Sequence, residues 1–386
     1  MKKVLVNICR LVLATVFILS GFVKAVDPLG TQYKIQDYLE AMHLGGLVPD
    51  MLTLAASVAQ SAVEFCLGIF LLFVIQRRLT SRLILIIMLV MTPLTLWLAI
   101  ANPISDCGCF GDALVLTNWQ TFWKNVVLLV CALVVARWPR VMFRFVSESN
   151  QWIVINYSIL FILGVSAWSL YDLPQFDFRP YHVGTDLRNN WERTMDGEDL
   201  PYADFFIEQA EDGEDITEAV LNDTSYVMLL ISPYLNQADD SRLDLINEIY
   251  EYSREHSYPF YCLTSSTENA MNQWRDRTGA EYPFCLTDGT TLKTVIRSNP
   301  GLLLLHNGII VRKWSHNSLP AISETETMLP LHQLEIGQPP RDSVPAKIAQ
   351  ILLWFVLPLT LLTIADRTWR WTRLLRRKAK KAQKAS

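Results

Sequence analysis

The sequence predicts a membrane protein: an all-α bundle of membrane-spanning helices, with an extracytoplasmic α/β domain inserted before the last span. Hydrophobic residues make up 51% of the 386, more than an ordinary soluble protein carries. Six apolar stretches approach the roughly twenty residues that a helix needs to cross a bilayer. Lys and Arg cluster between alternate stretches, as cytoplasmic segments should. The six stretches are residues 4–26, 48–75, 82–102, 119–138, 152–171 and 346–365.

The first stretch is expected to be a retained span rather than a signal peptide. "MKK" precedes it, as in a signal peptide, but Arg10 interrupts the apolar core. No small-residue cleavage site is evident after the core, and the chain continues as "SGFVKAVDP" over residues 20–28.

Positive charge sets the predicted orientation. It gathers in "MKK", in residues 76–82 and 137–144, and in the tail at 367–384. The positive-inside rule then predicts both termini in the cytoplasm and a multi-pass protein of the bacterial inner membrane. Residues 27–47, 103–118 and 172–345 are left outside, the last as a large periplasmic domain.

That external domain is acidic and the membrane part is basic. Residues 172–345 hold 29 acidic and 12 basic residues, whereas the rest of the chain holds 9 acidic and 22 basic. We expect protein partners and membrane lipid for such a chain, and no nucleic acid. The predicted domains are a membrane bundle at 1–145, a fifth span at 146–171, the periplasmic domain at 172–345 with its α/β core at about 222–320, a sixth span at 346–366 and a basic cytoplasmic tail at 367–386.

The external domain is expected to begin irregularly and then to fold as a small α/β unit. The composition of residues 171–220 suggests extended strands and turns more than a core. A regular alternation follows, and Asn307-Gly308 is a strong hairpin signal near its end. The predicted order is strand 225–232, helix 237–256, strand 258–266, helix 267–279, strand 282–288, helix 290–298 and a hairpin at 301–315.

These elements resemble the thioredoxin-like superfamily. The matching residues are the strand Tyr226–Ser232, "YPFCLTD" at 282–288 and "NPGLLLLHNGIIVRKW" at 299–314. The resemblance implies that Pro300 occupies the place of the family's cis-proline, beside the active site. The family's Cys-x-x-Cys would follow the first central strand, but residues 232–239 read "SPYLNQAD".

Without those cysteines, the resemblance implies a binding domain rather than a dithiol exchanger. A partner would then dock on the surface around Pro300, Ser232 and Pro233.

Sequence position separates the seven cysteines into three groups. Cys9, Cys66 and Cys131 fall in spans, where apolar packing is the expected role. Cys262 and Cys285 fall in strands of the external domain, where buried packing is favoured over a disulfide or an exchange partner. Cys107 and Cys109 lie in the external loop "DCGCFGD", residues 106–112, on the oxidising side of the membrane.

The spacing of Cys107 and Cys109 favours redox chemistry. The intervening glycine allows a tight turn, and the small ring of a Cys-x-Cys disulfide is strained and easily reduced. Asn118 can cap the next span, whose N-terminus would favour a thiolate. An inert structural turn is the alternative. A metal half-site is disfavoured, and no metal is expected, because zinc usually needs four ligands and no second His or Cys pair is near.

Charged residues in the spans give a second group of candidates. Glu64 lies near the middle of a span, where a carboxylate marks a proton or ligand pathway or else a paired structural residue. Lys24 and Asp27 end the first span, where snorkelling and helix capping are favoured. In the alternative they form a polar mouth around the cysteine loop, together with Asp106 and Asp112.

The membrane part resembles the MauE/DoxX family. The matching residues are "SGFVKAVDP", Glu64 and Gly68 of "AQSAVEFCLG", and "DCGCFGD" followed by "NWQTFWKN". The Cys-x-Cys-Phe-Gly pattern favours the MauE branch. That branch is associated with maturation of methylamine dehydrogenase, a disulfide-rich periplasmic enzyme. DoxX relatives are linked to quinone-coupled oxidation, which makes a quinone the candidate cofactor.

Two hypotheses for function follow. In the first, the protein is a membrane thiol–disulfide oxidoreductase or an accessory of one, with Cys107, Cys109 and Glu64 as catalytic residues and a periplasmic client or thioredoxin-like protein as partner. In the second, it is a non-catalytic assembly factor that binds through the external domain. A transporter that uses Glu64 is a weaker hypothesis, because the spans show no repeat or broken-helix signature.

Overall fold

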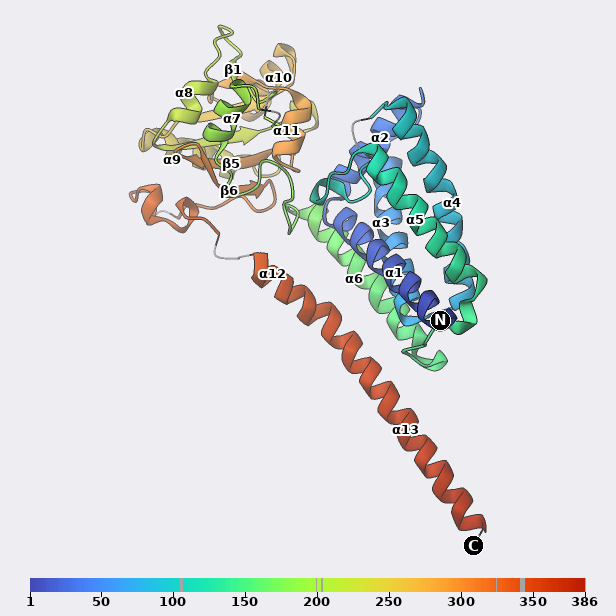
Figure 1. Ribbon diagram of the computed structural model, residues 1–386. Coiled ribbons are helices and arrows are strands. Elements are labelled where there is room, and N and C mark those ends of the chain that lie inside the picture. Colours follow the sequence, from blue (N-terminus) through green and yellow to red (C-terminus); the bar gives the residue numbers. More distant parts are fainter. Residues whose placement is uncertain (105–106, 199, 203, 324, 341–343, 386) are drawn as a thin grey trace. The chain divides into compact units, whose positions relative to one another are not determined.

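The computed structural model describes residues 1–104, 107–198, 200–202, 204–323, 325–340 and 344–385 (Figure 1). The chain divides into two compact units. The first joins Met1–Leu170 to Val344–Ser386, and the second is Tyr171–Ser343.

The first unit is helical. Within the described residues, six helices are long and apolar enough to cross a membrane, and each predicted apolar stretch lies largely within one of them. They are α1 (Lys2–Val26), α3 (Asp50–Phe73), α4 (Arg77–Ala101), α5 (Asn118–Arg137), α6 (Gln151–Tyr171) and a C-terminal helix made of α12 (Val344–Ile351), the π-helical turn η7 (Leu352–Val356) and α13 (Leu357–Ala385).

Residues 27–47 hold a helix that the sequence analysis did not predict, α2 (Pro28–Ala41). Asp27 caps it, since the Asp27 carboxylate accepts a hydrogen bond from the Gly30 N–H at 2.9 Å, and Pro28 occupies the first helical position. An acidic cap followed by proline is a helix-start signal. The helix was not predicted because the apolar and polar residues of this segment are only weakly separated onto two faces.

Helices α1 and α3 approach each other at two glycines. A Cβ atom on Gly21 would lie 2.3 Å from the backbone nitrogen of Phe65, and one on Gly68 would lie 2.7 Å from that of Ile18. Small residues allow membrane helices to pack this closely. The close crossing places polar side chains of α1 directly against those of α3.

The second unit contains a six-stranded mixed sheet in the order β1-β4-β3-β2-β5-β6. Strand β2 pairs in parallel with β3 and antiparallel with β5, and β3 pairs in parallel with β4. The β5–β6 hairpin turns at Asn307 and Gly308, which both have positive φ. The strands are β1 (Glu208–Gln209), β2 (Tyr226–Ile231), β3 (Phe260–Thr264), β4 (Phe284–Leu286), β5 (Gly301–His306) and β6 (Ile309–Ser315).

Helices cover both faces of this sheet, so β2 is buried throughout. Met228 and Leu230 of β2 share a core with α9 (Leu243–Glu255) and α10 (Glu268–Thr278). Val227, Leu229 and Ile231 point to the other face, where α8 (Thr217–Asn222) and α11 (Gly289–Val295) pack. A strand covered on both faces reads as a continuous apolar run, which is how the sequence presents it.

The expectation that residues 171–220 contribute little core is wrong. This segment forms α7 (Leu187–Met195), β1 and α8, and it buries Tyr181, Phe205 and Ile207 in the second core. Its buried apolar residues are widely spaced among acidic residues, so they form no periodic pattern in the sequence that would predict their burial. Their burial depends on contact with the sheet.

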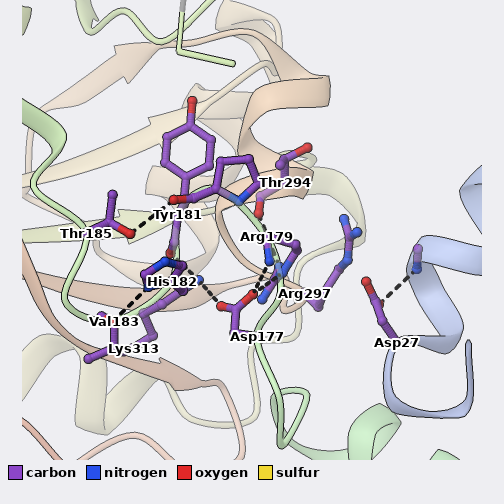
Figure 2. A network of polar contacts seen from close by, with 12 residues as sticks. Asp27, Asp177, Arg179, Tyr181, His182, Val183, Thr185, Thr294, Arg297 and Lys313 are labelled. Carbon is purple, nitrogen blue, oxygen red and sulfur yellow. Dashed lines mark hydrogen bonds and ion pairs between the residues drawn. The ribbon is translucent and has the colours of Figure 1, made fainter. Parts of the chain in front are cut away.

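Buried ion pairs hold the start of this segment against the sheet (Figure 2). Asp177 contacts Arg179 at 2.6 Å and Lys313 of β6 at 2.8 Å. Both cations are only 2% exposed, and Arg179 also donates to the carbonyl of Thr294 in α11. Burial opposes ionisation of Asp177, but the charges of Lys313 and Arg179 outweigh it and lower the pKa of this carboxyl.

We expect Asp177→Asn to lower the free energy of unfolding of the second unit by about 3–5 kcal/mol, because two buried cations would lose their counter-charge. Hydrogen exchange of the β2 amides in the full chain measures this change. As a control, Arg254→Gln removes the exposed ion pair with Glu281 and should cost no more than about 1 kcal/mol. Equal effects of the two substitutions would contradict the prediction.

Candidate functional site, a thiol pair in a polar loop

Cys107 and Cys109 lie in the loop between α4 and α5, whose two ends are tied together. Thr117, not Asn118 as predicted, caps α5, and it forms a reciprocal capping box with Gln120. Asn118 is the first helical residue. Its side-chain amide donates at 2.8 Å both to the Asn102 side chain and to the carbonyl of Ile104.

The turn itself requires glycine, as predicted. Gly108 has a φ of +63°, and a Cβ atom there would lie 3.0 Å from the Lys34 side chain. The two sulfur atoms, of Cys107 and Cys109, lie 2.7 Å apart, and both cysteines are free. A disulfide needs about 2.0 Å between the sulfurs, so a shift of less than about 1 Å would form it.

The two thiols have different acidities. The pKa of Cys109 is lowered to about 6, because the Cys107 thiol donates a hydrogen bond to its sulfur and because Lys124 and Lys24 supply positive charge; burial opposes the change. The same shared hydrogen bond, together with burial, raises the pKa of Cys107. Cys109 is half-buried and Cys107 is 7% exposed. Cys109 is therefore the thiol of the pair that favours the thiolate, and it is the more exposed residue of the two.

Tyr38 of α2 contacts the backbone of Cys107. Its hydroxyl donates to the Cys107 carbonyl at 3.0 Å, and a hydrogen bond from Tyr38 also acts against the raised pKa of the Cys107 thiol. Tyr38 could not be identified from the sequence, because the helix α2 that carries it was not predicted. Lys124 was missed too: its ammonium lies 4.4 Å from the centre of the Phe110 ring, beside the thiols.

A buried polar network of α1 and α3 meets the loop at Ser20. The Lys24 ammonium contacts the two Glu64 oxygens at 2.7 and 2.8 Å, and Gln60 donates to Glu64 at 3.1 Å. The Ser20 hydroxyl lies 2.7 Å from Glu64 Oε2 and 2.7 Å from the Cys109 carbonyl oxygen. A hydroxyl has one proton, so Ser20 donates to one of these acceptors at a time. Ser20 thus links the interior of the bundle to the cysteine turn.

The structure places the remaining candidates of this unit in different roles. Lys24 is only 4% exposed and ion-paired, so the snorkelling interpretation is wrong for it. Asp27 caps α2, as the capping interpretation predicted. Asp112 is half-buried in the 3-10 turn Gly111–Ala113, just after the cysteines. Asp106 lies outside the described residues.

In the second unit, the predicted partner-binding residues lie together but are buried. The Asn299–Pro300 peptide bond is cis, as the resemblance implied. Ser232 donates to the Asn299 side chain at 2.7 Å, and the Asn299 amide donates to the Tyr234 carbonyl at 2.9 Å. Ser232, Pro233 and Pro300 are all buried, whereas Tyr234 is 37% exposed. Their binding role stays a prediction, with Tyr234 as the accessible contact.

Cys262 and Cys285 are free and fully buried, as the packing interpretation predicted. They lie on neighbouring strands but belong to the cores on opposite faces of the sheet, so their side chains cannot meet. Burial raises the pKa of Cys262, and it raises that of Cys285 to about 12. Across the described ranges, no three His, Cys, Asp or Glu side chains gather as metal ligands would.

Comparison with known proteins supports the membrane assignment. Residues 2–137 match the family model of the methylamine utilisation protein MauE. The matched region holds α1 to α5, and with them the cysteine loop and the Lys24–Glu64 pair. Together with the apolar helices, this match supports a multi-pass membrane protein of a MauE-like family. No curated protein sequence matches the chain.

A solved solution structure of a proposed protein disulfide isomerase from Bacteroides thetaiotaomicron is similar to part of the chain. The identity is 17%, the match covers 30% of this chain and 76% of the other, and the TM-score is 0.24. The fold of the second unit accordingly rests on its own strand order and pairings.

The acidity of Cys109 makes a testable prediction. In the reduced protein, alkylation of Cys109 by iodoacetamide should rise with pH around a midpoint near 6, because only the thiolate reacts. Lys124→Gln should move the midpoint towards the value of a free thiol, about 8.5. Peptide mass spectrometry measures both, with Lys3→Gln as the control lysine and buried Cys285 as the thiol that stays unlabelled. An unshifted midpoint near 8.5 in the wild-type protein would contradict the assignment.

Proposed function

We propose that the protein is a membrane thiol–disulfide oxidoreductase, or an accessory of one, that acts on client proteins through Cys107 and Cys109. The observation that carries this proposal is the pair itself: two free sulfurs 2.7 Å apart, one with its pKa lowered to about 6 and the other retaining its proton. Disulfide exchange needs two adjacent thiols of this kind, because one thiolate attacks first and the second thiol resolves.

The exchange runs in two balanced steps. The Cys109 thiolate attacks one sulfur of a client disulfide; the client S–S bond breaks, a mixed disulfide forms and the other client sulfur leaves as a thiolate. That thiolate takes the proton of Cys107, whose sulfur then attacks Cys109 and releases the second client thiolate. The client is reduced by two electrons and the loop is oxidised to a disulfide. Run backwards, the same steps oxidise a client, and the two reduction potentials decide the direction.

The distribution of charge supports a location for this chemistry. Lys and Arg at the ends of α1, α4 and α5 that lie away from the cysteine loop favour a cytoplasmic position for those ends. The loop and the second unit would then face the periplasm of a bacterial inner membrane, where client disulfides persist. Periplasmic proteins, including enzymes rich in disulfides, are the clients this orientation suggests.

Lys24, Glu64 and Ser20 serve this reaction by position and charge. The Lys24 ammonium favours the Cys109 thiolate, while Ser20 holds the backbone of Cys109. Glu64 keeps Lys24 in place. Lys24 and Gln60 direct three contacts at the Glu64 carboxylate, and Ser20 adds a fourth when its proton turns from the Cys109 carbonyl to Glu64, which occupies most of its acceptor positions. The arrangement therefore does not fit a quinone bound at Glu64, and no step runs through one.

A non-catalytic assembly factor is the second candidate. The observation that favours it is the second unit, in which Tyr234 is exposed beside Asn299 and residues 232–239 contain no cysteine. If binding by this unit is the whole function, replacing Cys107 and Cys109 together by serine leaves client maturation intact. Substitution of the exposed Tyr234 then abolishes it.

Trapping tests the first candidate. Cys107→Ser should accumulate a mixed disulfide between Cys109 and an envelope protein, because the resolving thiol is gone. The matched Cys109→Ser variant should trap far less, since Cys107 is buried, with only 7% of its surface exposed. Non-reducing electrophoresis with mass spectrometry of the trapped species measures both. Absence of any adduct, with both wild-type cysteines staying reduced in cells, would overturn the proposed exchange.

Tyr38→Phe should slow the second step and spare the first. The Tyr38 hydroxyl donates to the Cys107 carbonyl in the reduced loop, and Tyr38 also acts to lower the pKa of the Cys107 thiol. When its single proton turns to the Cys107 thiolate during resolution, a hydrogen bond to a charged group contributes about 1.5 kcal/mol, so resolution without it should slow about tenfold. Rapid-quench trapping in the otherwise wild-type loop would show the mixed disulfide persisting, while the pH profile of Cys109 alkylation stays unchanged.

Tyr157→Phe provides the control for Tyr38→Phe. It removes a hydroxyl that donates to the carbonyl of Trp354, within the membrane helices. An equal effect of the two substitutions on resolution would assign Tyr38 a merely structural role.

A further inference from the structure

A second polar feature lies at the end of α4 and α5 remote from the cysteine loop. A cavity of about 330 Å³ opens where α4 begins and α5 ends. Its wall combines cations with apolar side chains and contains no carboxylate. The lining residues are Arg78, Arg82, Ala136, Arg137, Trp138, Pro139, Arg140 and Val141.

Local structure brings the four arginines together. Arg78 and Arg82 lie one turn apart on α4 and so share a face. Arg137 ends α5, and the 3-10 turn Pro139–Val141 carries Arg140 back towards α4. The Arg77 guanidinium donates to the Arg140 carbonyl at 3.4 Å, which ties this turn to the start of α4.

Within the described part of the first unit, these four arginines contrast with Arg144 and Arg370, which have carboxylate partners. Arg144 is paired with Glu148 and Arg370 with Asp366, each at 2.6 Å. Among the described residues, no ion pair is found for Arg78, Arg82, Arg137 or Arg140. Four guanidinium groups around one cavity repel each other, so an anion bound among them would be stabilised.

The surface beside the cavity points to the source of that anion. Leu79, Leu83 and Ile86 of α4, and Val130 and Leu133 of α5, are exposed apolar residues. They continue from the arginines along both helices, which are long enough to cross a membrane. A soluble anion would use only the arginines, whereas a lipid would also cover this apolar surface.

We propose that this cavity binds the phosphate of an anionic phospholipid, with arginine forks on the head group and the acyl chains along the apolar faces of α4 and α5. Arginine suits a phosphate because its planar fork donates two parallel hydrogen bonds. Basic pockets between the cytoplasmic ends of membrane helices are suited to anionic head groups. The inference is independent of the thiol chemistry.

Lipid binding by the purified full-length protein in a nonionic detergent tests the proposal. Native mass spectrometry should show phosphatidylglycerol retained by the wild-type protein, and added phosphatidylglycerol should raise its melting temperature. The double variant Arg78→Gln/Arg82→Gln should lower the affinity for this lipid by a factor of about ten or more, because two charge-assisted contacts are gone. Arg144→Gln, at the same end of the bundle but paired with Glu148, should behave as wild type.

Three further measurements test whether the bound anion is the phosphate of a lipid and whether the glutamine variant is folded. Phosphatidylcholine should give no comparable shift, because it has no net negative charge. Arg78→Lys/Arg82→Lys should retain part of the binding, which also shows that loss in the glutamine variant is not misfolding. Inorganic phosphate alone should not replace the lipid. Equal shifts with both phospholipids, equal binding by the glutamine variant, or full replacement by inorganic phosphate would each overturn the proposal.

Discussion

The ion pair between Lys24 and Glu64 is the interaction on which the first unit and its thiol site depend. Two buried charges in a membrane bundle are costly unless they meet, and removing one partner of such a pair costs about 3–5 kcal/mol. The pair can form because Gly21 and Gly68 let α1 and α3 approach closely. Larger residues at these glycines would separate the helices and leave both charges without a partner.

The pair also sets the charge at the thiols. The Lys24 ammonium is close enough to favour the Cys109 thiolate, and Lys124 of α5 adds a second cation. Formation of a disulfide would remove the Cys109 thiolate and with it the attraction to these two ammonium groups. The surroundings therefore stabilise the reduced loop relative to the oxidised one. A loop poised in this way favours the direction in which its disulfide accepts two electrons from the thiols of a client, and a more oxidising partner would be needed to restore the disulfide.

The sequence predicts the architecture better than the site. Apolar runs, long ones for membrane spans and short ones for strands, carry strong local signals. The long helices, the order of strands and helices along the chain and the Asn307-Gly308 turn are therefore predictable. Cys107, Cys109 and Glu64 were likewise identifiable, because two cysteines around a glycine and a carboxylate inside an apolar run are rare. Tyr38, Lys124 and Ser20 were not, because their roles arise from contacts between distant segments. The Lys24–Glu64 pair spans 40 residues of sequence and two helices, and no local pattern specifies it.

The two groups of cysteines outside the spans differ in their accessibility and in the charges around them. Cys262 and Cys285 lie within a sheet of mixed topology, yet burial suppresses their ionisation and the sheet separates them. Cys107 and Cys109 lie in a short turn on a helical bundle, where nearby ammonium groups favour one thiolate and glycine brings the second sulfur beside it. Thiol exchange needs a thiolate, a neighbour that can resolve it and a path for a client sulfur. The turn brings the first two together, and the sheet supplies neither, so Cys107 and Cys109 are the pair suited to the proposed exchange.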